Sequence, residues 1–193
     1  MKTRTKKILL GALISLFGIL GFFGFGIYYG INYSHQHCIK QIGLAFPIYA
    51  ADHFGHLPFS TNGFGDALLL LVKLDPSVIN SVCGPDDDGH FFKEALKDNS
   101  IVPEEKCSRI YIQGLSETND PEICILFDRN SCKGGDHGRS PWGHLLREVS
   151  MLDGEMRYVR DEDWPEFSRK QVELLVAAGF ARTNALHFYP GAK

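Results

Sequence analysis

The strongest fold signal in the sequence is EVSMLDGEMRYV, residues 148–159. Asp153-Gly154 stands between two short segments, 148–152 and 155–159, and Asp-Gly between two strands is a common turn signal for a β-hairpin. In both segments apolar residues alternate with polar ones, as in a strand with one buried face. We therefore predict an antiparallel hairpin with positive φ at Asp153 and Gly154 and with one face packed on a helix.

Two further strands are predicted upstream of the hairpin. RIYIQ (109–113) and ICILF (123–127) are rich in β-branched and aromatic residues, which favour strands. Helices are predicted at 64–74, where Asp75-Pro76 closes the segment, and at 164–178, where Gly179 ends it. Residues 77–89 indicate a loop. Helices that precede the strands favour an α+β fold with an antiparallel sheet and a C-terminal helix.

An apolar segment, ILLGALISLFGILGFFGFGIYYGI at 8–31, contains no charged residue and no proline. A helix needs about 20 apolar residues to span a bilayer, so we expect this segment to be a transmembrane helix that is retained as an anchor. Lys2, Arg4, Lys6 and Lys7 precede it and predict a cytoplasmic N-terminus. The expected organisation is a cytoplasmic tail (1–7), the span (8–31) and an extracytoplasmic domain (32–193).

The helical pattern continues beyond this segment. Apolar residues recur at three- and four-residue steps from residue 38 to Tyr49, as on the buried face of an amphipathic helix. We expect one long helix from the membrane to about Ala51, kinked at Pro47. It should pack on the small sheet.

The charge distribution argues against nucleic acid as a partner. The chain has 20 basic and 23 acidic residues, and no acidic residue occurs before Asp52. Without the four basic residues of the tail, the rest of the chain has 16 basic and 23 acidic residues and carries a charge of −7. An acidic outer domain does not favour binding to nucleic acid or to anionic lipid.

Four stretches in the same order resemble bacterial type IV pilin-like proteins and type II secretion pseudopilins, in particular the group with the H-X9-DG domain. The stretches are CIKQIGLAFPIYAADHFGHLP (38–58), DALLLLVKLDPSVINSVCGPDDD (66–88), RIYIQGL (109–115) and HGRSPWGHLLREVSMLDGEMRYV (137–159). In the last stretch Arg147, Asp153 and Gly154 occupy positions of the family motif. The resemblance implies a pilin-like fold and a non-catalytic binding or assembly role.

The resemblance also implies a cellular location and binding partners. It suggests a single-pass protein of the bacterial inner membrane, with its main domain periplasmic or extracellular, beside type II secretion or type IV pilus-like subunits. The segment Lys7-Ile8-Leu9-Leu10 lacks the Gly, Thr and Glu of the family's prepilin peptidase site. We therefore expect the anchor to remain uncleaved.

The five cysteines are compatible with disulfides outside the cytoplasm. Because five is odd, at least one thiol is left over, and Cys38 beside the membrane is the one expected. Of the possible pairings we favour Cys83 with Cys107 and Cys124 with Cys132. Reduced, buried thiols are the alternative.

Two loops hold candidate chemistry. Asp86, Asp87 and Asp88 could supply oxygen ligands to Ca²⁺, although we expect no bound cofactor. The loop from Asp136 to His144 contains carboxylate, hydroxyl and imidazole groups, so the alternative function is a membrane-tethered extracytoplasmic enzyme. Catalysis requires a nucleophile and an oriented base within reach of each other, which a polar loop does not ensure. We therefore expect no enzyme activity.

Overall fold

The computed structural model describes residues 15–26, 41–83, 89–131 and 145–189. The chain divides into two compact units, residues 1–34 and residues 35–193. In the first unit residues 15–26 form a helix whose side chains are all exposed. Within the described ranges, none of the helices combines the length and the apolar character that crossing a bilayer requires. The transmembrane span expected at 8–31 lies only partly within these ranges and stays a prediction.

The second unit contains a four-stranded antiparallel sheet with the order β1-β2-β3-β4. The strands are β1 (Arg109–Tyr111), β2 (Cys124–Asp128), β3 (Leu146–Met151) and β4 (Met156–Arg160). All four lie where the sequence predicts strands, and their ends differ from the prediction by at most two residues. The predicted α+β class and antiparallel sheet are therefore confirmed.

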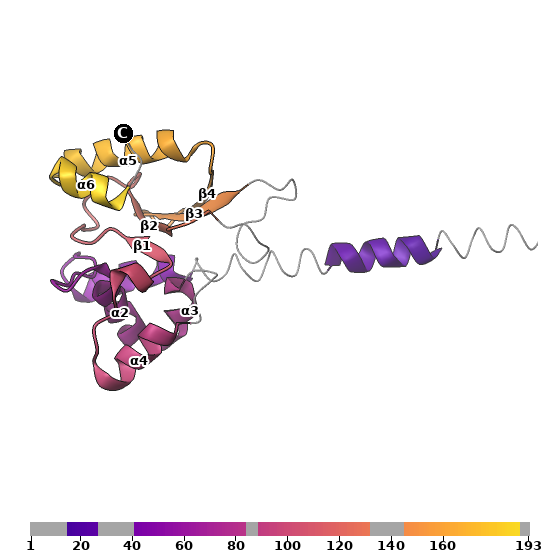
Figure 1. Ribbon diagram of the computed structural model, residues 1–193, viewed down its shortest axis with the longest axis horizontal. Coiled ribbons are helices and arrows are strands. Elements are labelled where there is room, and N and C mark those ends of the chain that lie inside the picture. The colour runs from indigo at the N-terminus through magenta and orange to yellow at the C-terminus, as the bar shows by residue number, and fades with distance from the viewer. Residues whose placement is uncertain (1–14, 27–40, 84–88, 132–144, 190–193) are drawn as a thin grey trace, which may run out of the picture. The chain divides into compact units, whose positions relative to one another are not determined.

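Helices cover both faces of the sheet. On one face the ring of Phe46, in the helix of residues 41–52, stacks on Tyr111 at a centroid distance of 5.2 Å. On the other face Phe127 stacks on Tyr189 at 4.8 Å, beneath α5 (Trp164–Ala177) and α6 (Arg182–Phe188). Figure 1 shows α5 and α6 on one side of the strands and α2, α3 and α4 on the other. The residues that contact the two helical layers alternate along the strands, because successive side chains point to opposite faces.

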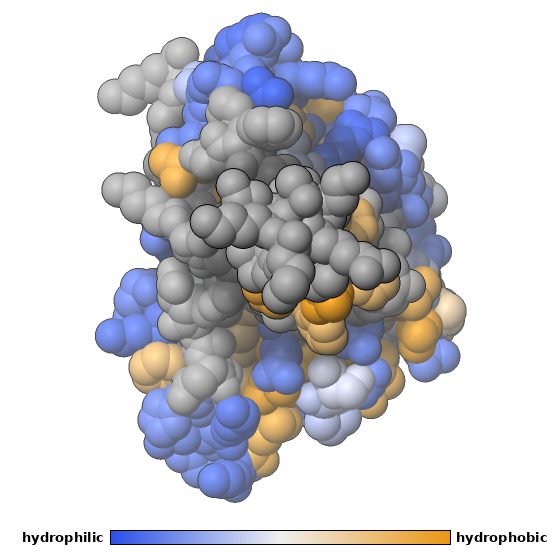
Figure 2. Space-filling model, turned by 90° about the vertical axis from the view of Figure 1, so that its right-hand side faces the viewer, coloured by the Kyte–Doolittle hydropathy of each residue, from blue (hydrophilic) through white to orange (hydrophobic). Residues whose placement is uncertain are grey.

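The helix of residues 41–52 shares the first side of the sheet with α2 (Phe64–Leu74), α3 (Ile79–Val82), α4 (His90–Asp98) and the 3-10 helix η1 (Pro76–Val78). On the face shown in Figure 2, hydrophobic residues lie among hydrophilic ones and are seen mainly in the lower half of the view. The predicted α2 is confirmed with the same bounds. The prediction of a loop from residue 77 is wrong for η1 and α3. The side chain of Asp75 accepts a hydrogen bond from the Ser77 N–H at 2.9 Å, so the Asp-Pro pair that ends α2 also begins the next helical turn.

The helix of residues 41–52 is described from residue 41 onward and continues through Pro47. Its buried residues include Ile42, Phe46 and Ala50, at the helical spacing seen in the sequence. The residues that would join it to the helix of residues 15–26 lie outside the described ranges. One long pilin-like helix therefore stays a prediction.

The turn of the hairpin differs from the prediction in the backbone conformation of Asp153. Gly154 has a φ of 83°, whereas the only described non-glycine residues with positive φ are Phe54 and Asn99. The N–H of Met151 donates to the carbonyl of Glu155 at 2.8 Å, and the Gly154 N–H donates to Met151 at 3.0 Å. The turn is therefore a three-residue connection with one left-handed glycine, and the positive φ predicted for Asp153 is wrong.

Candidate functional site

The motif residue Arg147 joins three parts of the second unit. Its guanidinium donates to the carbonyl oxygens of Asp128, at 3.3 Å, and of Arg129, at the end of β2. It also donates to the carboxylate of Asp161 at 3.3 Å, and its central carbon lies 4.6 Å from the ring centroid of Trp164. This cation–π contact attaches the first residue of α5 to the sheet. Arg147 therefore has a structural role in the described contacts.

The motif residues Asp153 and Gly154 shape the hairpin turn. The Asp153 carboxylate accepts a hydrogen bond from the Glu155 N–H at 2.8 Å, which stabilises the turn locally. Gly154 lies against Gly43 of the helix of residues 41–52, and a Cβ added at Gly43 would be 3.5 Å from the Gly154 carbonyl oxygen. Gly154 thus brings the turn of the hairpin against this helix.

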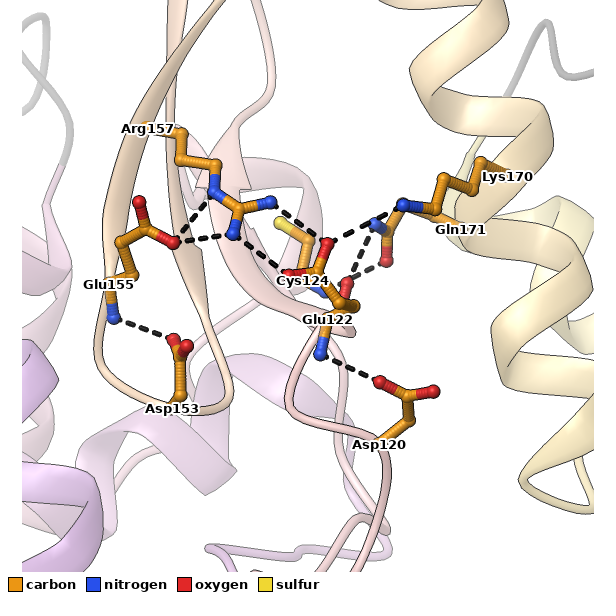
Figure 3. A network of polar contacts seen from close by, with 8 residues as sticks. All are labelled: Asp120, Glu122, Cys124, Asp153, Glu155, Arg157, Lys170 and Gln171. Carbon is orange, nitrogen blue, oxygen red and sulfur yellow. Dashed lines mark hydrogen bonds and ion pairs between the residues drawn. The ribbon is translucent and has the colours of Figure 1, made fainter.

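A polar network lies on the opposite side of the hairpin (Figure 3). The guanidinium of Arg157 donates to both carboxylate oxygens of Glu122 at 3.0 Å and also to the carboxylate of Glu155. Lys170 of α5 lies 3.4 Å from Glu122 as well. These cations lower the pKa of Glu122 to about 2, chiefly through the hydrogen bonds of Arg157. Because the groups are partly exposed, the network joins β4 to α5 with little net stabilisation.

Gln171 forms the buried part of this network. Its side chain is almost fully buried, and its amide oxygen accepts a hydrogen bond from the backbone N–H of Cys124 at 2.8 Å. Its amide nitrogen donates to the backbone carbonyl of Glu122 at 3.0 Å. One side chain of α5 thus satisfies two backbone groups at the start of β2, where the sheet ladder is incomplete. The sequence analysis missed Gln171, because a glutamine on a helix carries no sign of its partner.

A row of buried charges crosses three strands. The guanidinium of Arg109 on β1 donates to Asp128 on β2 at 3.1 Å and to Glu148 on β3 at 3.0 Å, and it also donates to the carbonyl of Ser81. Asp128 in turn accepts the Glu148 N–H at 2.9 Å. All three charged side chains are at most 2% exposed. The sequence analysis missed this row as well.

In this row one guanidinium pairs with two carboxylates, and the pKa values of both acids are raised. Burial raises the pKa of Glu148 to about 7, against the opposing effect of Arg109. Burial likewise raises the pKa of Asp128. A cluster with two negative and one positive buried charge is costly, so a proton held on one acid relieves it. The row is closed off from solvent, which fits a structural role better than chemistry on a substrate.

The described cysteines are thiols. Cys83, Cys107 and Cys124 are all buried and none of them is in a disulfide. The expected Cys83–Cys107 bridge is therefore not present, and Cys124 is a free thiol and not bridged to Cys132 as expected. Cys107 donates to the carbonyl of Pro103 at 3.6 Å, and Cys83 lies beside Gly89. Burial raises the pKa of Cys124 to about 12, which suppresses the thiolate needed for disulfide exchange.

Several expected site residues lie outside the described ranges. They are Asp86, Asp87 and Asp88 of the candidate Ca²⁺ loop, the loop from Asp136 to His144, and the cysteines Cys38 and Cys132. Within the described ranges, no three His, Cys, Asp or Glu side chains are grouped so that they could hold a metal ion. The candidate metal and enzyme sites therefore stay predictions.

An apolar groove lies along the exposed side of the helix of residues 41–52. Leu44 and Ile48 are 68% and 57% exposed, and the end of α2 contributes Leu74, which is 45% exposed. These residues line a groove of about 440 Å³ together with Gln41, Ala45, Asp75 and Ser77. Exposed aliphatic side chains at i and i+4 on one helix are a suitable surface for a partner protein. We refer to this surface as the helix groove.

Comparisons with protein-family models, with curated proteins and with solved structures found no significant match to this chain. The resemblance to pseudopilins therefore rests on the four sequence stretches alone.

Proposed function

We propose that the chain is a membrane-anchored, pilin-like protein whose extracytoplasmic domain has a non-catalytic binding or assembly role. The partner expected from the family resemblance is another pilin-like or secretion-machinery subunit. The observation that carries the anchoring is the helix of residues 15–26. Seven of its large apolar side chains are more than half exposed: Leu16, Phe17, Ile19, Leu20, Phe22, Phe23 and Phe25.

Lipid is the environment that suits this helix. Exposing so many apolar side chains to water is unfavourable, whereas a bilayer accommodates them on all sides of a helix. The wider segment 8–31 has no charged residue, and four basic residues before it favour a cytoplasmic N-terminus. The helix groove supports the assembly role, because it leaves an apolar stripe of the second unit available to a partner.

The anchoring is tested with a reporter protein fused after Lys193. We expect the reporter to be active only outside the cytoplasm and the protein to stay in the membrane fraction after alkaline washing. In a matched variant, Leu16→Lys and Phe23→Lys together should release the protein from the membrane. Reporter activity in the cytoplasm of cells with the unchanged chain would contradict the proposal.

The assembly role is tested at the helix groove with a photo-crosslinking residue in place of Leu44. We expect crosslinks to another membrane protein of the pilin or secretion class, and Leu44→Asp should abolish the corresponding complex. The same crosslinker at Lys97, on the exposed side of α4, is the control and should yield no such product. Equal crosslinking from both positions would mean that the helix groove is not the assembly surface.

A further inference from the structure

A second hollow lies where residues that follow β1 meet the connection between α5 and α6. Its volume is about 500 Å³, within the range of about 300–1,000 Å³ typical of small-molecule sites. Its lining combines three phenylalanine rings with three polar side chains: Phe59, Phe180, Phe188, Gln113, Asn184 and His187. We refer to it as the aromatic pocket.

The aromatic pocket has no acidic side chain and no Lys or Arg among its described lining residues. This is notable in a chain with 23 acidic and 20 basic residues. A charged ligand would lose its hydration without gaining an opposite charge, which is strongly unfavourable. The composition of the pocket therefore selects an uncharged ligand.

The three phenylalanines come from three separate segments and offer flat apolar surfaces. Phe59 is 56% exposed although it is a large aromatic residue. Phe180 is held over Gly114, which has a φ of 88°, and a Cβ at Gly114 would lie 3.7 Å from the edge of the Phe180 ring. A left-handed glycine thus allows the backbone after β1 to approach the edge of this aromatic ring. Aromatic rings suit a ligand with flat C–H faces.

The polar side chains argue against a purely apolar ligand. The Gln113 amide oxygen accepts a hydrogen bond from the Ser60 N–H at 3.1 Å, which orients its amide nitrogen. Within the described ranges, the side chains of Asn184 and His187 make no hydrogen bond. An apolar ligand would remove water from these groups and leave them without hydrogen-bond partners, which is unfavourable.

We propose that the aromatic pocket binds an uncharged carbohydrate, in the form of a short neutral oligosaccharide. A sugar ring offers C–H faces for the phenylalanines and hydroxyl groups that both donate to and accept from amide and imidazole side chains. Phe59 is the stacking residue in this assignment, and Asn184 and Gln113 are the hydrogen-bonding residues. The proposal is independent of the membrane topology and of the assembly role proposed above.

The test is isothermal titration calorimetry on the full chain in lipid nanodiscs, since sugar-based detergents would compete for the pocket. The probes are chitotetraose, cellotetraose and maltotetraose, with the anionic tetragalacturonic acid for comparison. We expect at least one neutral probe to bind with a dissociation constant below 1 mM, a threshold of roughly −4 kcal/mol in binding free energy, and the anionic probe to bind at least tenfold more weakly.

Two variants locate the binding site. Phe59→Ala and Asn184→Asp change exposed side chains and should each weaken binding of the neutral probe at least tenfold. Ile101→Ala, which truncates a side chain that is 58% exposed elsewhere on the second unit, is the matched control and should leave binding unchanged. Binding of none of the neutral probes, stronger binding of the anionic probe, or equal binding by the pocket variants and the control would each overturn the proposal.

Discussion

The backbone of Gly154, in the turn between β3 and β4, lies directly against the backbone of Gly43 in the helix of residues 41–52. A Cβ added at Gly43 would be 3.5 Å from the Gly154 carbonyl oxygen, and one added at Gly154 would be 3.9 Å from the Gly43 carbonyl oxygen. The hairpin therefore rests on the helix through two residues without side chains. This contact connects the strongest hairpin signal of the sequence to the helix that precedes the sheet.

Gly154→Val should destabilise the second unit. Gly154 has a φ of 83°, which a β-branched residue adopts only with strain of about 1–3 kcal/mol. A domain of this size has a total stability of about 5–15 kcal/mol, so thermal unfolding of the purified chain should show a clearly lower melting temperature. Gly154→Asn is the matched control, because asparagine tolerates the left-handed region, and it should lose much less stability. Equal melting temperatures for the two variants would mean that this conformation is not required.

Gly65→Ala and Gly43→Ala should differ although both glycines lie in helices. Alanine normally stabilises a helix by about 1 kcal/mol relative to glycine. A Cβ at Gly65 would overlap with the carbonyl oxygen of Val102, whereas a Cβ at Gly43 makes an ordinary van der Waals contact. We expect Gly65→Ala to lower the midpoint of urea unfolding and Gly43→Ala to leave it unchanged or raise it. If Gly65→Ala is stabilising, the close approach of α2 to Val102 is incorrect.

Gln171→Leu should cost more stability than Arg157→Gln, although Arg157 makes more contacts. Loss of the buried Gln171 amide leaves the Cys124 N–H and the Glu122 carbonyl without their partner, at about 1–3 kcal/mol for a buried group. Arg157 pairs with carboxylates that are 42% and 52% exposed, and exposed pairs contribute about 0–1 kcal/mol. Urea unfolding of both variants at low and moderate salt decides the order. A larger loss of stability for Arg157→Gln would mean that the ion pairs of Arg157 contribute more to stability than the hydrogen bonds of Gln171.

The stability of the second unit should decrease as the pH rises from about 4.5 to about 7. Glu148 has a pKa of about 7 in the folded protein, against an ordinary value of 4.5, so the folded state binds more protons than the unfolded state in this window. The stabilisation is complete below the ordinary pKa and is lost as the pH rises through the folded pKa. A shift of this size corresponds to about 3 kcal/mol at most. The depressed pKa of Glu122 acts in the opposite sense but at lower pH, between about 2 and 4.5.

Glu148→Gln is the control for this pH dependence. The amide keeps an oxygen that can accept the Arg109 hydrogen bond but cannot ionise. Chemical denaturation at several pH values should therefore show a shallower decrease in this variant than in the unchanged protein. Stability that increases through the same window in the unchanged protein would show that the row is fully ionised when folded.

The thiols of Cys83, Cys107 and Cys124 should be unreactive in the native state. All three are buried, and the raised pKa of Cys124 leaves almost no thiolate near neutral pH. We expect iodoacetamide to modify none of them in the native protein and all three after denaturation without reductant, as read by mass spectrometry. A peptide that joins Cys83 to Cys107 would restore the disulfide expected from the sequence.

Local patterns of the sequence were sufficient for most of the sheet and for the main C-terminal helix. Alternation of polar and apolar residues predicts β3 and β4, and Trp164-Pro165 and Gly179 mark the limits of α5 within one residue. Each of these signals acts between residues a few positions apart, where propensity and turn chemistry decide the backbone. The same local signals were misread around Asp75-Pro76, because an Asp-Pro pair both ends one helix and begins another. The short helices α4 and α6 were not predicted.

The contacts between side chains that are far apart in the sequence depend on the packing of the folded unit. Arg109 lies 19 residues from Asp128 and 39 from Glu148 along the chain, and the strand register brings the three into one buried row. The contact between Gly43 and Gly154, the two hydrogen bonds of Gln171 and the aromatic pocket likewise join segments far apart in sequence. A local pattern predicts that a residue is on a helix or a strand, but it contains no information about which distant residue the side chain contacts. That partner is determined by the register of the sheet and the packing of helices on its two faces, which depend on the whole unit folding at once.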